Sequence, residues 1–72
     1  MTFGEQAVGL SFNPSGNAQV DALKKAFAQI IDMLNDTREE LNDGEQKRLY
    51  SIAITEAQGA QMWAVKAVTW RT

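Results

Sequence analysis

The chain contains no cysteine and no histidine. Without cysteine it can form no disulfide, no thiolate nucleophile and no cysteine–zinc site. Without histidine it lacks the usual general base, the commonest metal ligand and every serine–histidine or cysteine–histidine arrangement. These two absences remove most routes to catalysis before any motif is considered.

The chain is also short. A 72-residue chain makes one small domain at most, and a lone fold of this size hides only about 60% of its unfolded surface. Scaffolds this small usually add disulfides, a metal or oligomerisation. We therefore expect self-association.

Composition and charge narrow the class of protein. Apolar residues make up 44% of the chain and charged residues 22%, as in an ordinary globular domain. The net charge of −2 argues against binding a DNA or RNA polymer, which requires a strongly basic face. No apolar run approaches a membrane span, and no secretory signal opens the chain. We expect a cytoplasmic protein that binds no membrane.

Residues 1–16 are expected to form an arm. Three of the five glycines and the single proline, Pro14, lie in this stretch. Such residues favour turns, so at most one helical turn is expected, around residues 5–8. The arm also carries apolar side chains, which we expect to pack on the rest of the protein.

Two helices are expected after the arm. The first spans 17–41, with Asn17 as N-cap and apolar residues at spacings of three and four. It either runs unbroken or is broken near 35–37, where Thr37 and Glu40 resemble a capping box. The second spans 44–71, with Asp43 as N-cap and apolar residues on two faces. One partner helix cannot cover both faces. The sequence predicts an all-α antiparallel helical hairpin with a short N-terminal arm, one domain over 1–72, that assembles into a homo-oligomer.

Acidic residues offer little chemistry. Glu39, Glu40 and Asp43 could form a carboxylate metal site, but solvated helix ends explain them as well. We expect no metal, no cofactor and no catalysis.

A binding site is easier to build from the arm. Phe12 lies between Ser11 and Asn13, and Lys24 follows on the first helix. An aromatic ring that stacks on a base, together with a lysine that meets phosphate, is the minimum for a nucleotide site. Alternatively, Phe12 is a hydrophobic staple and Lys24 is solvated. Lys24 flanks the apolar stripe, whereas Lys25 points away from it.

The end of the second helix combines cations with tryptophans. Lys66 and Arg71 could form an anion site where several chains converge, with arginine as the phosphate fork. Alternatively, this stretch is an oligomer interface with its cations near the helix C-terminus. Met62 and Trp63 are expected to be core residues.

Several segments together resemble phage anti-CBASS proteins, whose helical hairpin also occurs at the start of some anti-Thoeris sponges. The resemblance rests on TFGE at 2–5, FNPS at 12–15, LK at 23–24, FAQIID at 27–32, AITEAQ at 53–58 and QMWAVKAVTW at 61–70. It covers nearly the whole chain.

The resemblance implies a hexameric sponge in the cytoplasm of the infected bacterial host. Such proteins bind cyclic dinucleotides, and often cyclic trinucleotides at separate pockets, without cleaving them, and so block CBASS signalling. By position, Phe12 would stack on the ligand and Lys24 would contact phosphate. Some relatives have tyrosine at the position of Phe12, so a hydroxyl contact would be lost here. Arg71, Lys66 and Thr69 are the candidates for the trinucleotide pocket.

Two other functions remain open at this point. The hairpin could be a structural or protein-interaction module without nucleotide binding, which would present an exposed tryptophan-rich patch. A phosphodiesterase-like enzyme that degrades the messenger is the third hypothesis.

Overall fold

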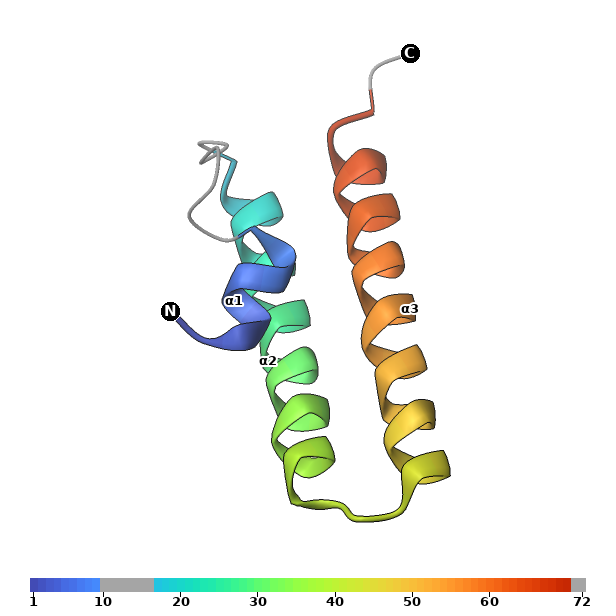
Figure 1. The fold of residues 1–72 in the computed structure, drawn as a ribbon. Coiled ribbons are helices and arrows are strands. Elements are labelled where there is room, and N and C mark those ends of the chain that lie inside the picture. The colour runs from blue at the N-terminus through green and yellow to red at the C-terminus, as the bar shows by residue number, and fades with distance from the viewer. Residues whose placement is uncertain (10–16, 71–72) are drawn as a thin grey trace.

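The computed structural model describes residues 1–9 and 17–70, which form three helices and no strand. The helices are α1 (Phe3–Val8), α2 (Ala18–Glu40) and α3 (Gly44–Val68). α2 and α3 run antiparallel as a hairpin, and the short α1 packs against α2 (Figure 1). The all-helical hairpin expected from the sequence is confirmed.

α1 is longer than the single turn expected for the arm. Thr2 and Glu5 form a capping box, in which Thr2 Oγ1 accepts from the Glu5 N–H at 3.0 Å and Glu5 Oε1 accepts from the Thr2 N–H at 2.8 Å. This reciprocal pair satisfies two backbone donors at the start of the helix. The helix ends at Gly9, whose φ of 67° lies in the left-handed region that glycine adopts without strain.

α2 begins at its expected cap and is not broken. Asn17 Oδ1 accepts from the N–H groups of Gln19 and Val20 at 2.9 and 3.1 Å. The alternative break near 35–37 does not form, because Thr37 Oγ1 donates to the Met33 carbonyl 3.1 Å away inside a continuous helix. Its hydroxyl is therefore engaged within α2 and caps no new turn.

α3 follows a short connection and is capped as expected. Asp43 Oδ1 accepts from the Gln46 N–H at 2.8 Å. At the same end of the hairpin, Arg38 donates to Asn35 Oδ1 at 2.6 Å and to Ser51 Oγ at 3.0 Å. The Arg38 guanidinium also lies 5.6 Å from the centre of the Phe3 ring, so one side chain connects all three helices.

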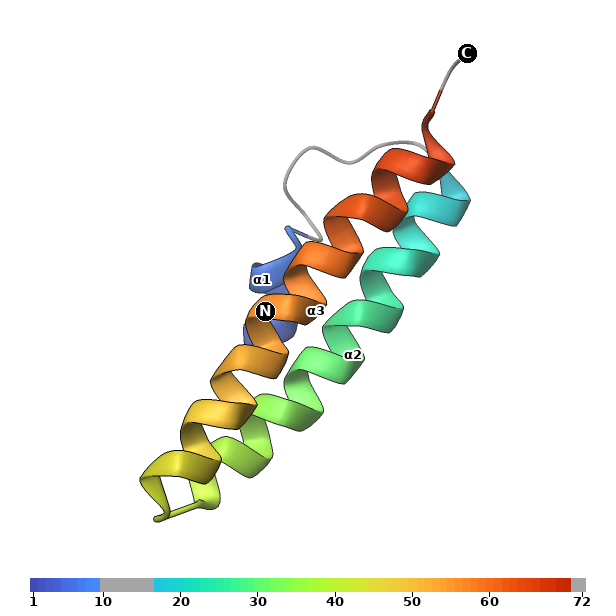
Figure 2. The ribbon, with the colours of Figure 1, turned by 90° about the vertical axis from the view of Figure 1, so that its right-hand side faces the viewer.

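The core is small because the molecule is thin. In the described part of the chain five hydrophobic residues are buried: Val8, Val20, Ala28, Ile31 and Ile54. They come from all three helices, and the Cα positions span only 14 Å in the thinnest direction (Figure 2). The α2–α3 hairpin is one helix thick, and the short α1 covers only part of one of its broad faces (Figure 1).

Much apolar surface is therefore exposed in a single chain. The chain exposes 5136 Å², whereas a compact monomer of this length exposes about 4,500 Å². Nine large hydrophobic side chains are exposed in the described part: Met1, Phe3, Ile30, Met33, Leu49, Ile52, Met62, Trp63 and Trp70. Neither α2 nor α3 is apolar enough, over a sufficient length, to span a membrane, and α1 is too short.

Candidate ligand site

A hollow of about 770 Å³ lies where the three helices meet. Its walls come from the last turn of α1, from Lys24 on α2 and from the second half of α3; the lining residues are Gln6, Ala7, Val8, Gly9, Lys24, Gln58, Gln61, Met62 and Val65. A volume of this size falls in the range of small-molecule sites. The position of α1 on α2 therefore creates a candidate ligand site.

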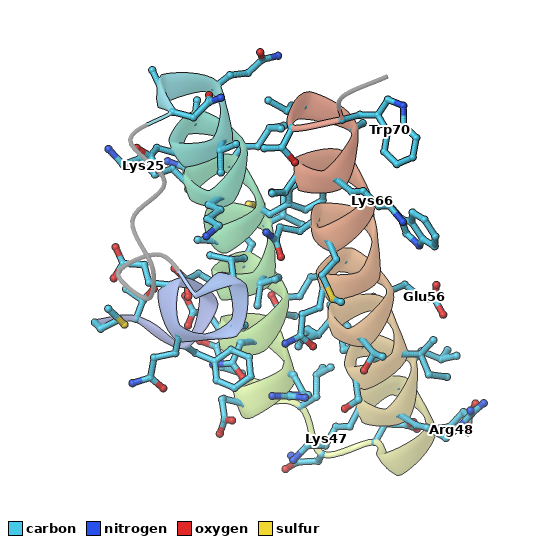
Figure 3. All side chains as sticks on the ribbon, turned by 90° about the horizontal axis from the view of Figure 1, so that it is seen from above. Lys25, Lys47, Arg48, Glu56, Lys66 and Trp70 are labelled. Carbon is cyan, nitrogen blue, oxygen red and sulfur yellow. The ribbon has the colours of Figure 1, made fainter. Side chains whose placement is uncertain are left out.

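Lys24 is the cation of this hollow. Its side chain is half-buried, and Nζ donates to the Gly9 carbonyl oxygen at 3.5 Å. The last carbonyls of a helix lack partners within it, so an ammonium group is favourable there. Lys25, by contrast, is exposed and points away from α3 (Figure 3). The different orientations expected for the two lysines are confirmed.

The charge of the hollow suits an anion. Among the described residues that line it, Lys24 is charged, the three glutamines are polar and neutral, and none is acidic. A second hollow, of about 200 Å³, is lined by α1 and α2 and includes Lys25 together with the carboxylates of Glu5 and Asp32. Two carboxylates there disfavour a phosphate, so the larger hollow is the better anion site.

The end of α3 presents a separate cluster of aromatic rings and a cation. Lys66 Nζ lies 5.3 Å from the centre of the Trp63 ring and 5.9 Å from that of Trp70, so both rings attract the ammonium group. Lys66 and Trp70 project from the side of α3 opposite α2 (Figure 3). A hollow of about 290 Å³ adjoins them, lined by Gly59, Met62, Trp63 and Lys66.

The expectation that Met62 and Trp63 are core residues is wrong for the single chain. Both side chains are 68% exposed. Thr69, the third candidate at this end, is exposed and donates from Oγ1 to the Val65 carbonyl at 2.8 Å. The hydroxyl oxygen of Thr69 remains able to accept a hydrogen bond.

Several predicted site residues lie outside the described residues. Ser11, Phe12 and Asn13 of the arm belong to residues 10–16, and Arg71 belongs to residues 71–72. The structure therefore places Lys24, Lys66 and Thr69. Lys24 belongs to the larger hollow, and Lys66 belongs to the cluster at the end of α3.

Sequence reasoning missed Gln58 and Gln61, which lie on the α3 wall of the larger hollow. Gln58 Nε2 donates to the Ala7 carbonyl at 3.5 Å, which joins α3 to α1. The available signal was the presence of two uncharged amides in an otherwise apolar and alanine-rich stretch.

Carboxylates elsewhere form no metal site in the described part of the chain. Glu39, Glu40 and Asp43, the alternative ligand set, do not come together, and no other group of three acidic side chains does so over residues 1–9 and 17–70. Near the loop, Arg48 donates to Glu45 at 2.7 Å. This bond lowers the pKa of Glu45 and raises the pKa of Arg48 relative to their ordinary values. Both side chains are exposed, and Arg48 lies at the opposite end of α3 from Lys66 (Figure 3).

Comparison with protein families identifies the hairpin. The family model described as "Acb2/Tad1, hairpin domain" matches residues 5–69 of the 72-residue chain. The chain belongs to the Acb2/Tad1 hairpin-domain family. The resemblance to anti-CBASS and anti-Thoeris sponges is thereby confirmed, and Acb2/Tad1 sponges are in general non-enzymatic. Searches of curated proteins and of solved structures find no match.

Proposed function

We propose that this Acb2/Tad1 hairpin is a non-enzymatic sponge for cyclic di- and trinucleotide second messengers. By sequestering the messenger in the cytoplasm of an infected bacterium, it would starve the CBASS effector and protect the phage. Family membership supports the general role, and the hollow that contains Lys24 supports the binding of an anion.

The observation that carries the proposal is the position of Lys24. Its side chain is half-buried beside a hollow whose described lining residues include no acid. A cyclic dinucleotide carries two negative charges, and a charge pair in such a partly water-excluded place interacts more strongly than in bulk water. One or two lysines per pocket can therefore be enough for a net-acidic protein to hold a small anion.

The arm completes this proposed site. Phe12 stacks on a base, and Ser11 and Asn13 supply small polar groups beside it. Within the arm, residues 10–16 join Gly9, whose carbonyl accepts from Lys24, to Asn17, the cap of α2. Both ends of the segment that contains Phe12 are therefore anchored near the first half of α2.

A second proposed site takes cyclic trinucleotides at the end of α3. Lys66 supplies a cation, Thr69 a hydroxyl and Arg71 a fork that pairs with phosphate oxygens. The two exposed tryptophan rings beside Lys66 offer surfaces on which bases stack.

We also propose that copies of the hairpin assemble, most simply as the hexamer typical of such sponges. The thin hairpin leaves nine large hydrophobic side chains exposed in the described part of the chain, and other copies of the same chain can cover them. Assembly would bring several Lys66 side chains together and so concentrate positive charge for the trinucleotide.

The direct test is a calorimetric titration of cyclic di-AMP into the wild type, Lys24→Met and Lys25→Met. We expect saturable binding by the wild type and by Lys25→Met, and at least a tenfold loss of affinity in Lys24→Met. Equal affinities of the two variants would remove Lys24 from the site. Circular dichroism of each variant checks that the fold is retained.

The alternative is a protein-interaction module, which the exposed Trp63 and Trp70 favour. It predicts that no cyclic nucleotide binds and that substituting either tryptophan abolishes capture of a partner protein. The calorimetric titration separates the two functions.

A further inference from the structure

Gln61 occupies an unusual position for a polar side chain. It is only 6% exposed and is the one buried side chain with a polar group in the described part of the molecule. Ile54, two turns earlier on the same helix, is a buried core residue. Burying an amide is unfavourable unless the amide gains a hydrogen bond.

No hydrogen bond joins the Gln61 side chain to another described residue, whereas Gln58 donates to Ala7. In residues 1–9 and 17–70, however, every side-chain nitrogen or oxygen that is fully shielded from solvent has a hydrogen-bond partner. The Gln61 amide therefore retains access to solvent, and the surface to which it contributes is the hollow that contains Lys24. The Gln61 amide thus provides a free hydrogen-bond donor, its NH₂ group, and a free acceptor, its oxygen, on the wall of the proposed ligand site.

The other polar residues that line the hollow indicate which part of a ligand would contact the Gln61 amide. Lys24, on α2, is the group suited to phosphate, whereas Gln61 and Gln58, on α3, are neutral and can both donate and accept. Gln58 already donates to the Ala7 carbonyl, which leaves its oxygen as an acceptor. If the phosphate of a ligand contacts Lys24 on α2, a base of the same ligand can contact the glutamines on α3.

We propose that Gln61 is a specificity-determining residue that pairs with an adenine base of the ligand. This inference rests on the proposed nucleotide-binding function. A carboxamide offers one donor beside one acceptor, and adenine presents the complementary pair in its N7 acceptor and N6 amino donor. The corresponding edge of guanine presents two acceptors, O6 and N7, which a single amide cannot satisfy together. The hollow therefore favours adenine over guanine.

The test compares cyclic di-AMP with cyclic di-GMP on the wild type and on Gln61→Met, whose side chain is similar in length but apolar. A bidentate pair predicts that the wild type binds cyclic di-AMP about tenfold or more tightly than cyclic di-GMP. In Gln61→Met the two affinities should become equal within about threefold. Gln29→Met, at an exposed position on α2, is the matched control and should keep the wild-type preference.

A second variant keeps the test decisive if Gln61→Met fails to fold. In Gln61→Glu the carboxylate cannot donate to N7, so the preference should move toward guanine, whose N1–H and N2–H₂ donors suit a carboxylate. A wild type that binds both ligands equally, or variants that keep its preference, would overturn the role of Gln61 and leave the sponge proposal standing. A wild type that binds neither ligand would overturn the sponge proposal itself.

Discussion

The backbone N–H of Gly4 donates a 2.7 Å hydrogen bond to Asp32 Oδ1, across 28 positions of the sequence. α1 and α2 approach so closely at this point that a Cβ on Gly4 would overlap the Ala28 carbonyl oxygen. Six residues are too few for a helix to be stable on its own. The contact with Asp32 therefore holds the first wall of the hollow in place.

Replacing Gly4 by alanine should separate α1 from α2. The added methyl group meets the backbone of Ala28, which cannot give way as a flexible side chain can. Overpacking of this kind lowers the free energy of unfolding by about 1–3 kcal/mol. Thermal and urea denaturation measure the loss.

Gly59→Ala is the control for this substitution. Nothing lies within 4 Å of a Cβ at Gly59, so alanine should stabilise the single chain by about 0.5–1 kcal/mol through its better helix propensity. A Gly4→Ala protein as stable as Gly59→Ala would contradict the close approach of α1.

Asp32→Asn should loosen α1 without adding bulk. The asparagine oxygen can still accept from Gly4, but the charge that strengthens the bond is lost, and we expect the free energy of unfolding to fall by about 1 kcal/mol. Affinity for cyclic di-AMP should fall with it, because α1 forms one wall of the hollow. Asp36→Asn, one turn further along α2 and exposed, should change neither quantity.

Trp63→Lys should weaken self-association. The Trp63 ring is 68% exposed in one chain, so its burial in an assembly would contribute strongly to the interface. Sedimentation velocity should give smaller species for Trp63→Lys than for the wild type at the same concentration. Gln46→Lys, an equal change of charge at another exposed position of α3, should leave the assembly intact. A wild type that sediments as a monomer would refute the proposed assembly.

Lys66→Gln should separate the two proposed sites. Because Lys66 lies at the end of α3 and Lys24 in the hollow, the substitution should lower affinity for a cyclic triadenylate at least tenfold and leave cyclic di-AMP binding unchanged. Calorimetric titrations of the cyclic triadenylate and of cyclic di-AMP into the same preparation of Lys66→Gln measure the two affinities. An equal loss for both ligands would mean that the sites are coupled or are one.

The features predicted correctly from the sequence depend on short stretches of chain. The caps at Asn17 and Asp43 need only the two or three residues that follow them. The orientation of Lys24 follows from the period of the helix on which it lies. The Thr2–Glu5 capping box is also a local signal. It starts a helix over Phe3–Val8, which is longer than the single turn expected around residues 5–8.

The features missed depend on contacts between distant segments. The contact between Gly4 and Asp32 arises from how closely two helices approach, which no local pattern encodes. The role of Gln61 was missed for the same reason. An amide within an apolar stretch can face solvent or a hollow, and the sequence does not show where α1 packs to form the hollow. The exposure of Trp63 depends on which face of α3 contacts α2, and the sequence offers two apolar faces.

The most direct test of the sponge is to melt the protein with cyclic di-AMP and then analyse the released ligand by chromatography. A ligand bound by the native state alone, at about 100 times its dissociation constant, stabilises that state by about 2.7 kcal/mol. For a domain of this size the melting temperature should then rise by about 10 °C or more. We predict this rise together with quantitative recovery of intact cyclic di-AMP. An unchanged melting temperature, or a linearised nucleotide after incubation, would contradict the account.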